Sequence, residues 1–476
     1  MKAVEAKVYV PGRTKHQAKP SRRRSGNNNH SKASQGGNAC ESEMAMTYDD
    51  VRMRGFRQRS DAWEARRKLL ESVRPLEAEM VSLWQTVGRV LAADVLAERD
   101  VPYFDRAAMD GYAVRGEETF GASVYNPLTF SLVGESLPGK PFPRALQSGE
   151  AVRIMTGAPL PEGANAVVRA ELATEANGVV SILEPVPPGK CVSRRGEDIR
   201  AGSVVLRAGR RLRPQDVAVL AALGYDSVPL IRTPQVAMVV TGDELLPVGS
   251  RPNNYCIVDS NSVMLDALIR RDGGRPIHGD IVPDQREVIH QRLLRACSEA
   301  DVVLVSGGSS VGQEDHAPRV VAELGELAVH GVAMRPSSPT GFGWVQGRPV
   351  VLLPGNPVSC LAAYDFFAGP LIRRLAGRST AWPYRRLRLP LAEKISSELG
   401  RLDYVRVRIR EGHVEPIATS GASILTTTTQ ADGFVLVPAD CEGYPAGTSV
   451  CVYLYDEDDS LQGEHAEAST GRAGLD

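Results

Sequence analysis

The 476-residue sequence lacks several features that would assign it to a class at once. It has no run of about 18 apolar residues, so we expect no membrane-spanning helix. The first residues are basic but form no continuous apolar stretch, which argues against a secretory signal. The seven cysteines include no Cys-x-x-Cys pair, which argues against a disulfide scaffold or a zinc site and fits a reduced cytoplasmic protein. A phosphate-binding G-x-x-x-x-G-K-[ST] loop is also missing, which excludes a P-loop NTPase.

An excess of charge of one sign is absent as well, because the net charge is −1. No global field therefore selects nucleic acid as a partner. The length and a hydrophobic content of 42% predict two to four domains with their own cores. Residues 1–45 and 459–476 are too polar to offset the entropy of ordering, so we predict disordered tails, the first one basic.

The pattern of apolar residues changes along the chain. Apolar residues three and four apart predict helices from Asp61 through WEARRKLLESV and MVSLWQTVGRVLAADVL. Short strands and turns follow over 103–190, and RPQDVAVLAALG predicts a short helix with Pro214 near its start and Gly224 at its end. Residues 233–377 alternate apolar strands with helices, which predicts a parallel sheet covered on both faces. From about residue 380 the pattern is β.

Four unusual loops follow strands of the predicted α/β domain. They contain Thr241–Glu244, Ser306–His316, Arg335–Pro339 and Pro354–Ser359. Ligands of parallel sheets bind at the carboxyl ends of the strands, where these loops should meet. Glycine-backed N–H groups, hydroxyls, a cation and carboxylates suit a phosphate or other oxyanion held with a divalent metal. Each loop alone could instead be a solvated turn or a helix cap.

The loop SGGSSVGQEDH allows two chemistries. Its G-x-S-x-G pattern could present Ser310 as a hydrolase nucleophile, or its backbone N–H groups could cradle an anion at a helix start. A hydrolase needs a later histidine in a loop, whereas His330 lies in a predicted strand and His413 lies in the β region. The sequence therefore favours an anion-binding nest of backbone N–H groups over a hydrolase nucleophile.

Three further motifs precede the α/β domain. PYFDRAAMDGYAVR contains Asp105 and Asp110, RIMTGAPLPEG contains Thr156, and RRGEDI contains Glu197 and Asp198. Physical reasoning alone leaves these residues as possible turn formers.

Seven motifs in order carry a specific resemblance: PYFDRAAMDGYAVR, RIMTGAPLPEGANAVV, RRGEDI, TGDEL, SGGSSVGQEDH, PTGFG and PGNPVS. Over residues 60–455 the chain resembles the molybdopterin molybdenumtransferase family, which includes the gephyrin E domain. The resemblance implies a multidomain α/β plus β fold, with a three-layer α/β pterin-binding domain whose sheet is mostly parallel. Its implied parts are an elongated helical domain (46–102 and 191–232), an inserted β domain (103–190), the α/β domain (233–377) and a C-terminal β-barrel-like domain (378–458).

The resemblance also implies a reaction, a Mg²⁺-dependent transfer of molybdate to adenylylated molybdopterin that releases AMP. It implies a homodimer with a site shared between subunits, and an upstream molybdopterin adenylyltransferase as a possible partner. Neither a membrane nor nucleic acid is expected as a partner. The implied catalytic residues are Asp110, Thr156, Asp198 and Asp315, and the implied metal ligands are Glu244 and Asp315. The implied substrate-binding residues are Gly307, Gly308, Ser309, Ser310, Arg335, Ser338, Pro354, Gly355, Asn356, Ser359, Asp284, Arg401 and Arg406.

The sequence departs from the family pattern at two places. Ser309 replaces a valine, and Ser337-Ser338 replace the Gly-Lys of the basic loop. A lost ammonium group beside an oxyanion removes about 1.5–3 kcal/mol of binding, unless Arg401 or Arg406 compensates. The alternatives are a paralogue with altered oxyanion handling and a non-catalytic scaffold of the same fold. The sequence does not distinguish molybdate from tungstate.

Overall fold

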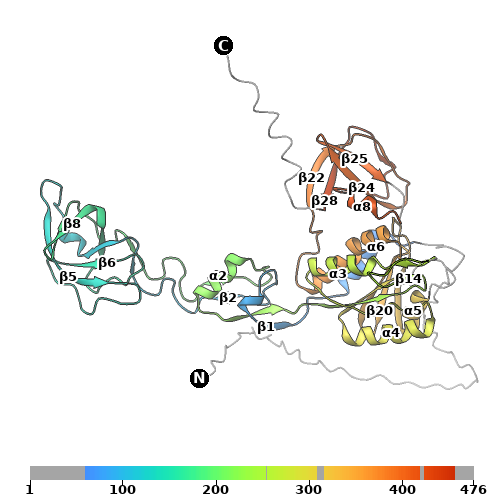
Figure 1. The fold of residues 1–476 in the computed structure, drawn as a ribbon, viewed down its shortest axis with the longest axis horizontal. Coiled ribbons are helices and arrows are strands. Elements are labelled where there is room, and N and C mark those ends of the chain that lie inside the picture. The colour runs from blue at the N-terminus through green and yellow to red at the C-terminus, as the bar shows by residue number, and fades with distance from the viewer. Residues whose placement is uncertain (1–58, 254, 308–315, 419–422, 456–476) are drawn as a thin grey trace, which may run out of the picture. The chain divides into compact units, whose positions relative to one another are not determined.

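The computed structural model describes residues 59–253, 255–307, 316–418 and 423–455 (Figure 1). Both predicted tails lie outside these ranges. The described part from Ser60 onward contains three separate six-stranded sheets and several two-stranded ones. It is a mixed α/β and β protein, as the sequence predicts.

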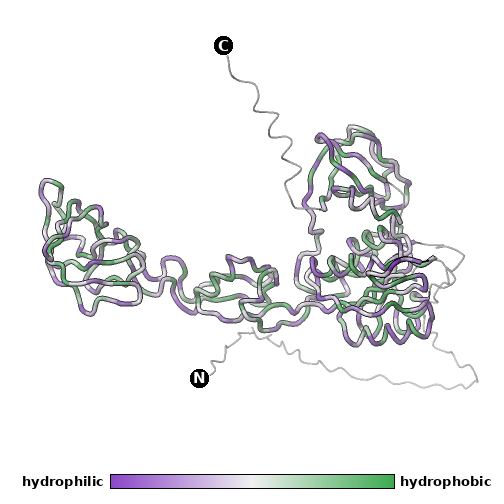
Figure 2. Tube along the Cα trace, in the orientation of Figure 1, coloured by the Kyte–Doolittle hydropathy of each residue, from purple (hydrophilic) through white to green (hydrophobic). Residues whose placement is uncertain are grey.

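The α/β domain is built on one six-stranded sheet with the order β16-β13-β17-β21-β20-β18. Four neighbouring strands are parallel, namely β16 (Arg275–Ile277), β13 (Gln235–Val240), β17 (Val302–Ser306) and β21 (Arg348–Leu353). Two antiparallel pairings complete the sheet, through β20 (Gly341–Val345) and β18 (Gly325–His330). The central strands are hydrophobic along their length (Figure 2), because both faces of the sheet are covered.

Helices cover the two faces of this sheet and make three layers. One core joins alternate strand residues, such as Met238 and Leu304, to helices on the first face, which are α1 (Ala62–Glu71), α3 (Asn261–Arg271), α6 (Pro357–Ala363), η4 (Tyr364–Ala368) and α7 (Gly369–Leu375). The other core joins the intervening residues, such as Val239 and Val305, to α4 (Arg286–Glu299) and α5 (Ala317–Leu324). The predicted helices and strands of this domain are confirmed, but β20 was missed.

Strand β20 was missed because its sequence, GFGWV, has two glycines and no clear alternation. It forms a hairpin with β21 through Gln346 and Gly347, which both have positive φ angles of 51° and 74°. Two successive positive φ angles are the signature of the turn that matches the twist of paired strands. Position 343 needs a glycine because β18 approaches it closely. A Cβ there would lie 2.0 Å from the Glu326 carbonyl oxygen.

The helix predicted over residues 80–96 is wrong. This stretch contains β1 (Ala78–Ser82), the short 3₁₀ turn η1 (Leu83–Gln85) and β2 (Val95–Leu96). Gly88, with φ of +81°, turns the chain between them. β1 pairs with β12 (Ser227–Ile231), β2 pairs with β11 (Val204–Leu206), and α2 (Pro214–Ala222) packs into the same small core. The apolar residues are spaced as in a helix because separate short strands each direct apolar side chains into this core.

The inserted β domain holds a six-stranded sheet with the order β7-β4-β6-β5-β9-β8. Its strands are β4 (Gly111–Val114), β5 (Leu128–Ser136), β6 (Glu150–Ile154), β7 (Ala166–Arg169), β8 (Ala173–Ala176) and β9 (Val179–Ile182). The chain enters and leaves beside a short pair formed by β3 (Arg106–Ala107) and β10 (Val192–Ser193). Apolar side chains fill both faces of the sheet.

The C-terminal β domain also has a six-stranded sheet, in which β25 pairs with β24 beside the path β19-β24-β26-β28-β22. Its strands are β22 (Arg385–Pro390), β24 (Leu402–Arg410), β25 (His413–Ala418), β26 (Gly433–Val437) and β28 (Ser449–Leu454). The remaining strand, β19 (Met334–Arg335), comes from the basic loop of the α/β domain and pairs with β24 in parallel. The basic loop is therefore tied to the C-terminal domain by main-chain hydrogen bonds. The boundaries between the domains stay predictions.

Candidate functional site

Three of the predicted loops meet at the carboxyl ends of the parallel strands. The Thr241 N–H donates to the Ser306 carbonyl at 2.9 Å, and the Gly307 N–H donates to the Leu353 carbonyl at 3.3 Å. A Cβ on Gly307 would lie 2.2 Å from the Thr241 carbonyl oxygen, and the φ of Gly307 is +96°. Glycine is therefore required there for two independent reasons. A Cβ on Gly355 would lie 3.6 Å from the Gly307 Cα, so the two glycine loops lie against each other.

Asn261 fastens these loops and was missed from the sequence. Its side-chain amide donates to the Ser306 Oγ at 2.9 Å and to the Gly355 carbonyl at 2.8 Å. Its Oδ1 is buried and has no hydrogen-bond partner among the described residues. Buried polar atoms without partners are rare and mark places where a ligand or water can bind. The sequence signal was weak, because an asparagine at the first position of a helix, directly after Ser260, is equally expected as part of a helix start.

The basic loop packs onto the first turn of α6. The Ser337 hydroxyl donates to the Ser359 carbonyl at 2.6 Å, and the Thr340 hydroxyl donates to the Ser337 carbonyl at 2.7 Å. Ser337 and Ser359 are buried, and Ser338 is half-buried. Ser337 has a φ of +100°, a conformation that favours glycine. The serine thus adopts a backbone conformation typical of glycine and adds a hydrogen bond.

Two arginines flank a buried carboxylate beside this loop. Asp403, which is 1% exposed, accepts a hydrogen bond from Arg335 and one from Arg401 at 3.2 Å. Arg335 and Arg401 are thus brought together, although they belong to different domains. Arg406 lies elsewhere in the C-terminal domain and is 1% exposed. Burial lowers the pKa of its guanidinium, which Tyr455 and Tyr404 partly counteract.

Carboxylates gather on the other side of Gly307. The Asp284 N–H donates to an Asp243 carboxylate oxygen at 3.2 Å. Burial raises the pKa of Asp284, and the neighbouring Glu244 and Asp243 raise it further. The Oδ1 of Asp284 is buried without a partner among the described residues. Next to it lies a cavity of about 550 Å³ whose polar lining includes Asp243, Asp259, Ser262 and Asp280.

The motifs of the inserted β domain and its base also come together. Asp110 accepts hydrogen bonds from the Thr156 N–H at 2.6 Å and the Thr156 hydroxyl at 2.7 Å, and these bonds lower its pKa. Asp105 joins the next motif, because its carboxylate accepts from the Arg195 N–H at 2.7 Å. Asp198 is exposed, and its N–H donates to the Val101 carbonyl at 3.1 Å. The structure thus groups Asp110 with Thr156, in a different domain from the glycine loops.

The remaining predicted residues divide into two sets. Pro354 is buried, while Gly355 and Asn356 are exposed at the start of α6. Gly308, Ser309, Ser310 and Asp315 lie outside the described residues, so their predicted roles stay predictions.

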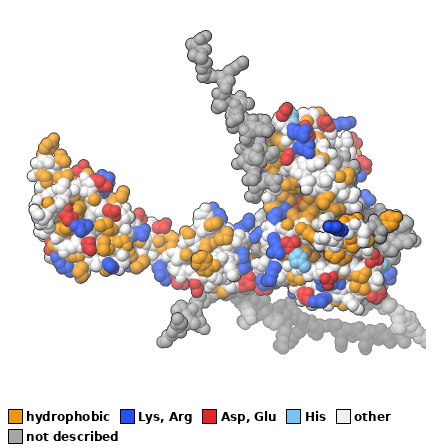
Figure 3. Space-filling view, viewed as in Figure 1, with side chains coloured by type: hydrophobic (Ala, Val, Ile, Leu, Met, Phe, Trp, Pro, Cys, Tyr) orange, Lys and Arg blue, Asp and Glu red, His pale blue; other side chains and the backbone are white. Residues whose placement is uncertain are grey.

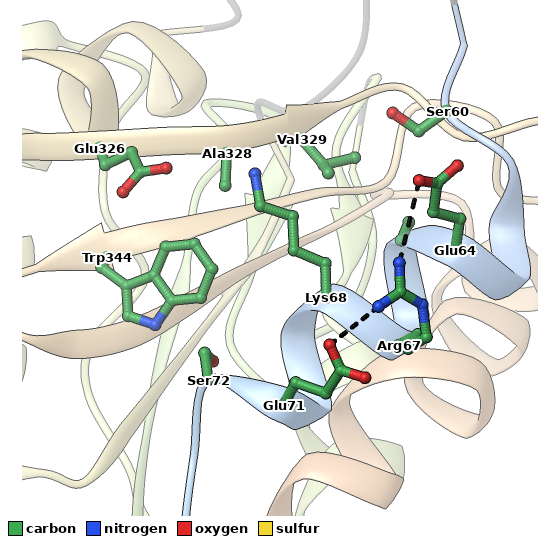
Figure 4. Close-up of a pocket in the computed structure, with 11 residues that line it drawn as sticks. Ser60, Glu64, Arg67, Lys68, Glu71, Ser72, Glu326, Ala328, Val329 and Trp344 are labelled. Atoms are coloured by element: carbon green, nitrogen blue, oxygen red, sulfur yellow. Dashed lines mark hydrogen bonds and ion pairs between the residues drawn. The ribbon is translucent and has the colours of Figure 1, made fainter.

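A groove of about 710 Å³ lies apart from these loops, between α1 and β18 (Figure 4). Figure 4 shows the Lys68 side chain extending from α1 towards Ala328, while Arg67 is paired with Glu64 and Glu71 on α1. None of the predicted site residues lines this groove.

Comparison with known proteins gives the family. Three family models match in order, described as the MoeA N-terminal region (domain I and II) over 61–224, a probable molybdopterin binding domain over 237–374, and the MoeA C-terminal region (domain IV) over 388–455. The molybdopterin molybdenumtransferase of Haemophilus influenzae is 32% identical over 82% of this chain and 97% of that protein. The enzyme of the same name from Bacillus subtilis is 33% identical over 84% of this chain and 95% of that protein.

A solved structure agrees with these relatives. The molybdopterin biosynthesis moeA protein from Pyrococcus horikoshii OT3 superposes with a TM-score of 0.70 and 34% identity, covering 84% of this chain and all of that one. Sequence motifs, domain order and fold therefore point to one conclusion. The chain belongs to the molybdopterin molybdenumtransferase family, whose members are transferases of molybdenum cofactor biosynthesis.

Proposed function

We propose that this protein transfers molybdate to adenylylated molybdopterin, with Mg²⁺ and with release of AMP. The observation that carries the proposal is the division of the sheet edge into two chemical halves. Gly307 and Gly355 meet in the centre, with Arg335, Ser337 and Ser359 on one side and Asp243 and Asp284 on the other. A pterin nucleotide with a phosphoanhydride needs both N–H donors for its phosphates and carboxylates for a cation.

In this proposal, the glycine loops bind the phosphates. The backbone of Gly307 approaches its neighbours too closely for any side chain, and its N–H donates to the Leu353 carbonyl. The N–H groups of Gly308 to Ser310 are therefore the ones proposed to bind the phosphates. Pro354, Gly355, Asn356 and Ser359 complete the cradle at the start of α6. Asn261 lies beneath this cradle, and its buried unpaired Oδ1 offers an acceptor to the amino and N–H groups of a pterin.

The acidic half fits a magnesium ion in the chemistry of its donors. Among the described residues no three His, Cys, Asp or Glu side chains are grouped tightly enough to hold a metal alone. Mg²⁺, however, is usually bound by one or two carboxylates together with substrate phosphates and water. Glu244 and Asp284, with Asp315, would supply the carboxylates. Burial first, and then the neighbouring Glu244 and Asp243, raise the pKa of Asp284, and a bound cation would favour its charged form. When bound, the ion would neutralise charge developing on the cleaved anhydride.

The oxyanion half would take molybdate. Arg335 is the cation of the basic loop, and Ser337 shapes that loop through its bond to the Ser359 carbonyl. Asp110 and Thr156 are proposed to contribute from the inserted β domain, with Asp198 from the neighbouring motif. We propose that the site forms in a homodimer, between the α/β domain of one subunit and the β domain of the other.

Exposed apolar side chains support the dimer. Trp84, Met80 and Val87 are 97%, 58% and 57% exposed, and Figure 3 shows hydrophobic side chains at the surface around β1 and α2. Large exposed apolar groups close together mark interaction surfaces. Within the described residues, no helix is long and apolar enough to cross a membrane. We propose that the protein acts in the cytoplasm and receives its substrate from the upstream adenylyltransferase.

The proposal is tested by AMP release. Purified protein is mixed with adenylylated molybdopterin, molybdate and Mg²⁺, and AMP is measured over time. We expect release that requires both molybdate and Mg²⁺, and a Glu244→Gln variant that needs more Mg²⁺ for the same rate. Glu299→Gln is the matched control, because Glu299 pairs with Arg295 on the surface of α4. Release without molybdate, or equal magnesium titrations for all three proteins, would contradict the proposed function.

A further inference from the structure

The chain enters and leaves the inserted β domain through a neck, which consists of residues 95–107 and 192–206. Short strand pairs close the neck at its two ends, β2 with β11 and β3 with β10. Between these pairs the Val101 N–H donates to the Ile199 carbonyl at 2.8 Å. The two segments are therefore joined by main-chain hydrogen bonds along the neck and do not form two separate linkers.

An ion pair crosses the neck from one segment to the other. Asp100 accepts a hydrogen bond from the Arg195 Nε at 2.6 Å and another from the Ala201 N–H at 2.9 Å. The Ala201 N–H, and then Arg195, lower the pKa of Asp100, because both bonds favour its charged form. Gly196 has a φ of +71°, and a Cβ there would lie 3.3 Å from the Asp100 Oδ1. The arginine and the glycine of the RRGEDI motif are therefore both fitted to Asp100.

Other residues of the RRGEDI motif also bond within the neck. The Glu197 carboxylate accepts from the Arg194 N–H at 2.8 Å and closes the turn between them. The N–H groups of Asp198 and Ile199 both donate to the Val101 carbonyl at 3.1 Å. The motif therefore builds the second segment of the neck and ties it to the first.

Arg195 continues this connection into the inserted β domain. Its N–H donates to the Asp105 carboxylate at 2.7 Å. The Asp105 carbonyl in turn accepts from the Leu160 N–H at 2.9 Å. Leu160 belongs to RIMTGAPLPEG, the motif that also contains Thr156. One residue, Asp105, thus contacts both the second neck segment and this motif of the inserted domain.

The loop around Thr156 is bonded to the first neck segment as well. The Gly157 N–H donates to the Ala107 carbonyl at 2.8 Å, and the Ala107 N–H donates to the Ala158 carbonyl at 3.0 Å. Thr156 itself donates to Asp110 through its N–H and its hydroxyl. The position of the Asp110–Thr156 pair therefore follows the position of the neck.

We propose that Asp100 is a positioning residue that holds the two neck segments together through Arg195 and so fixes where the inserted β domain places its site residues. This inference rests on the proposed function, in which Asp110 and Thr156 contribute from one subunit to the α/β domain of the other. The Arg195 side chain is 66% exposed, and exposed ion pairs add little to global stability. The ion pair therefore acts on the placement of the inserted domain and hardly on folding.

The first experiment measures AMP release by Asp100→Ala and Arg195→Ala, as kcat and as the KM for adenylylated molybdopterin at saturating molybdate and Mg²⁺. We expect kcat to fall about tenfold, because small displacements of site residues are costly. KM should stay within about twofold, because the glycine loops proposed to bind this substrate lie in the α/β domain. The double variant should be little worse than either single variant, since both residues act through one contact. Arg195→Lys should recover part of the loss, because it keeps the charge.

Limited digestion with trypsin gives a readout that does not depend on the reaction. Arg194, Arg195 and Arg200 are exposed in the second neck segment, so trypsin can cleave there once the backbone opens locally. The hydrogen-bonded neck of the parent should resist cleavage at these arginines. Asp100→Ala keeps all three of them, and we expect its neck to be cleaved about ten times faster than that of the parent.

Glu150→Ala is the matched control for both measurements. Glu150 accepts from Arg144 at 2.7 Å and from the Gln147 N–H at 2.9 Å, which is the same combination of partners that Asp100 has. Its side chain is 19% exposed, against 18% for Asp100. Because Glu150 lies in the inserted β domain and outside the neck, its loss should change neither kcat nor the rate of cleavage in the neck.

The outcomes separate this inference from the proposed function. An unchanged kcat in both Asp100→Ala and Arg195→Ala, or cleavage of the Asp100→Ala neck no faster than in the parent, would overturn the positioning role. The same losses in Glu150→Ala would also overturn it, because they indicate a general effect of losing such a carboxylate. Absence of molybdate-dependent AMP release in the parent would overturn the proposed function, and the trypsin comparison would still decide whether Asp100 holds the neck.

Discussion

The backbone conformation of Ser337 can be tested by its effect on stability. Its positive φ angle lowers the free energy of unfolding, whereas its side-chain hydrogen bond raises it. The residue is buried, has a φ of +100° and donates to the Ser359 carbonyl at 2.6 Å. A non-glycine residue in this region costs about 1–2 kcal/mol. The hydrogen bond stabilises the folded state by about 1 kcal/mol. The conformational cost and the hydrogen-bond gain are similar in size. Two substitutions separate them, because one removes both and the other removes only the hydrogen bond.

Ser337→Gly relieves the strain but loses the hydrogen bond and about 0.5–1 kcal/mol of chain entropy. We expect it to change the free energy of unfolding by less than about 0.5 kcal/mol. Ser337→Ala loses the same hydrogen bond and keeps the strain, so we expect it to destabilise by about 1 kcal/mol. The glycine variant should therefore be the more stable of the two, which reverses the usual order of these residues.

The assay compares thermal unfolding of the two variants under identical conditions. For a domain of this size, 1 kcal/mol corresponds to about 2–4 °C in midpoint, so Ser337→Gly should melt higher by roughly that amount. The neighbouring Ser338 provides the matched control, because it is not among the residues with positive φ. There the alanine variant should melt at least as high as the glycine variant. An alanine variant at position 337 that melts above the glycine variant would refute the strained conformation.

Two further predictions concern other parts of the chain. Ser310→Ala should retain most of the AMP release, since loss of a true nucleophile costs several orders of magnitude; a covalent adduct of a serine-directed fluorophosphonate on Ser310 would show that the nest reading is wrong. Asp216→Asn should destabilise the protein by about 2 kcal/mol near pH 7, because the buried carboxylate is held by Arg210 and Arg213 at the start of α2. Those arginines hold the pKa of Asp216 well below its ordinary value, so this stability is present above about pH 4 and is lost as the pH falls towards the lowered pKa. The midpoint difference between parent and Asp216→Asn should shrink below pH 4, and a difference that is constant down to pH 2 would contradict this assignment.

The sequence by itself determined the α/β domain and the loops that meet at the edge of its sheet. Continuous apolar strands such as QVAMVV and DVVLVS need cover on both faces, and this requirement fixes a parallel sheet with helices on either side. Parallel strands place their carboxyl ends together, so the meeting of Gly307 and Gly355 followed from the strand pattern alone. The seven motifs added the family, which the relatives and family models confirm.

Only the tertiary structure decided the features that depend on contacts between distant residues. The spacing of Val81, Val90 and Val95 fits a helix locally, but pairing with β12 and β11 makes short strands, because those partners lie more than 100 residues away. Asn261 became a site residue only when α3 was placed beside Ser306 and Gly355. The sequence named Arg401 and Arg406 as equal candidates for a missing cation. The structure separates them, because the parallel pairing of β19 with β24 brings Arg401 and Asp403 to Arg335, while Arg406 is buried three residues further along the strand.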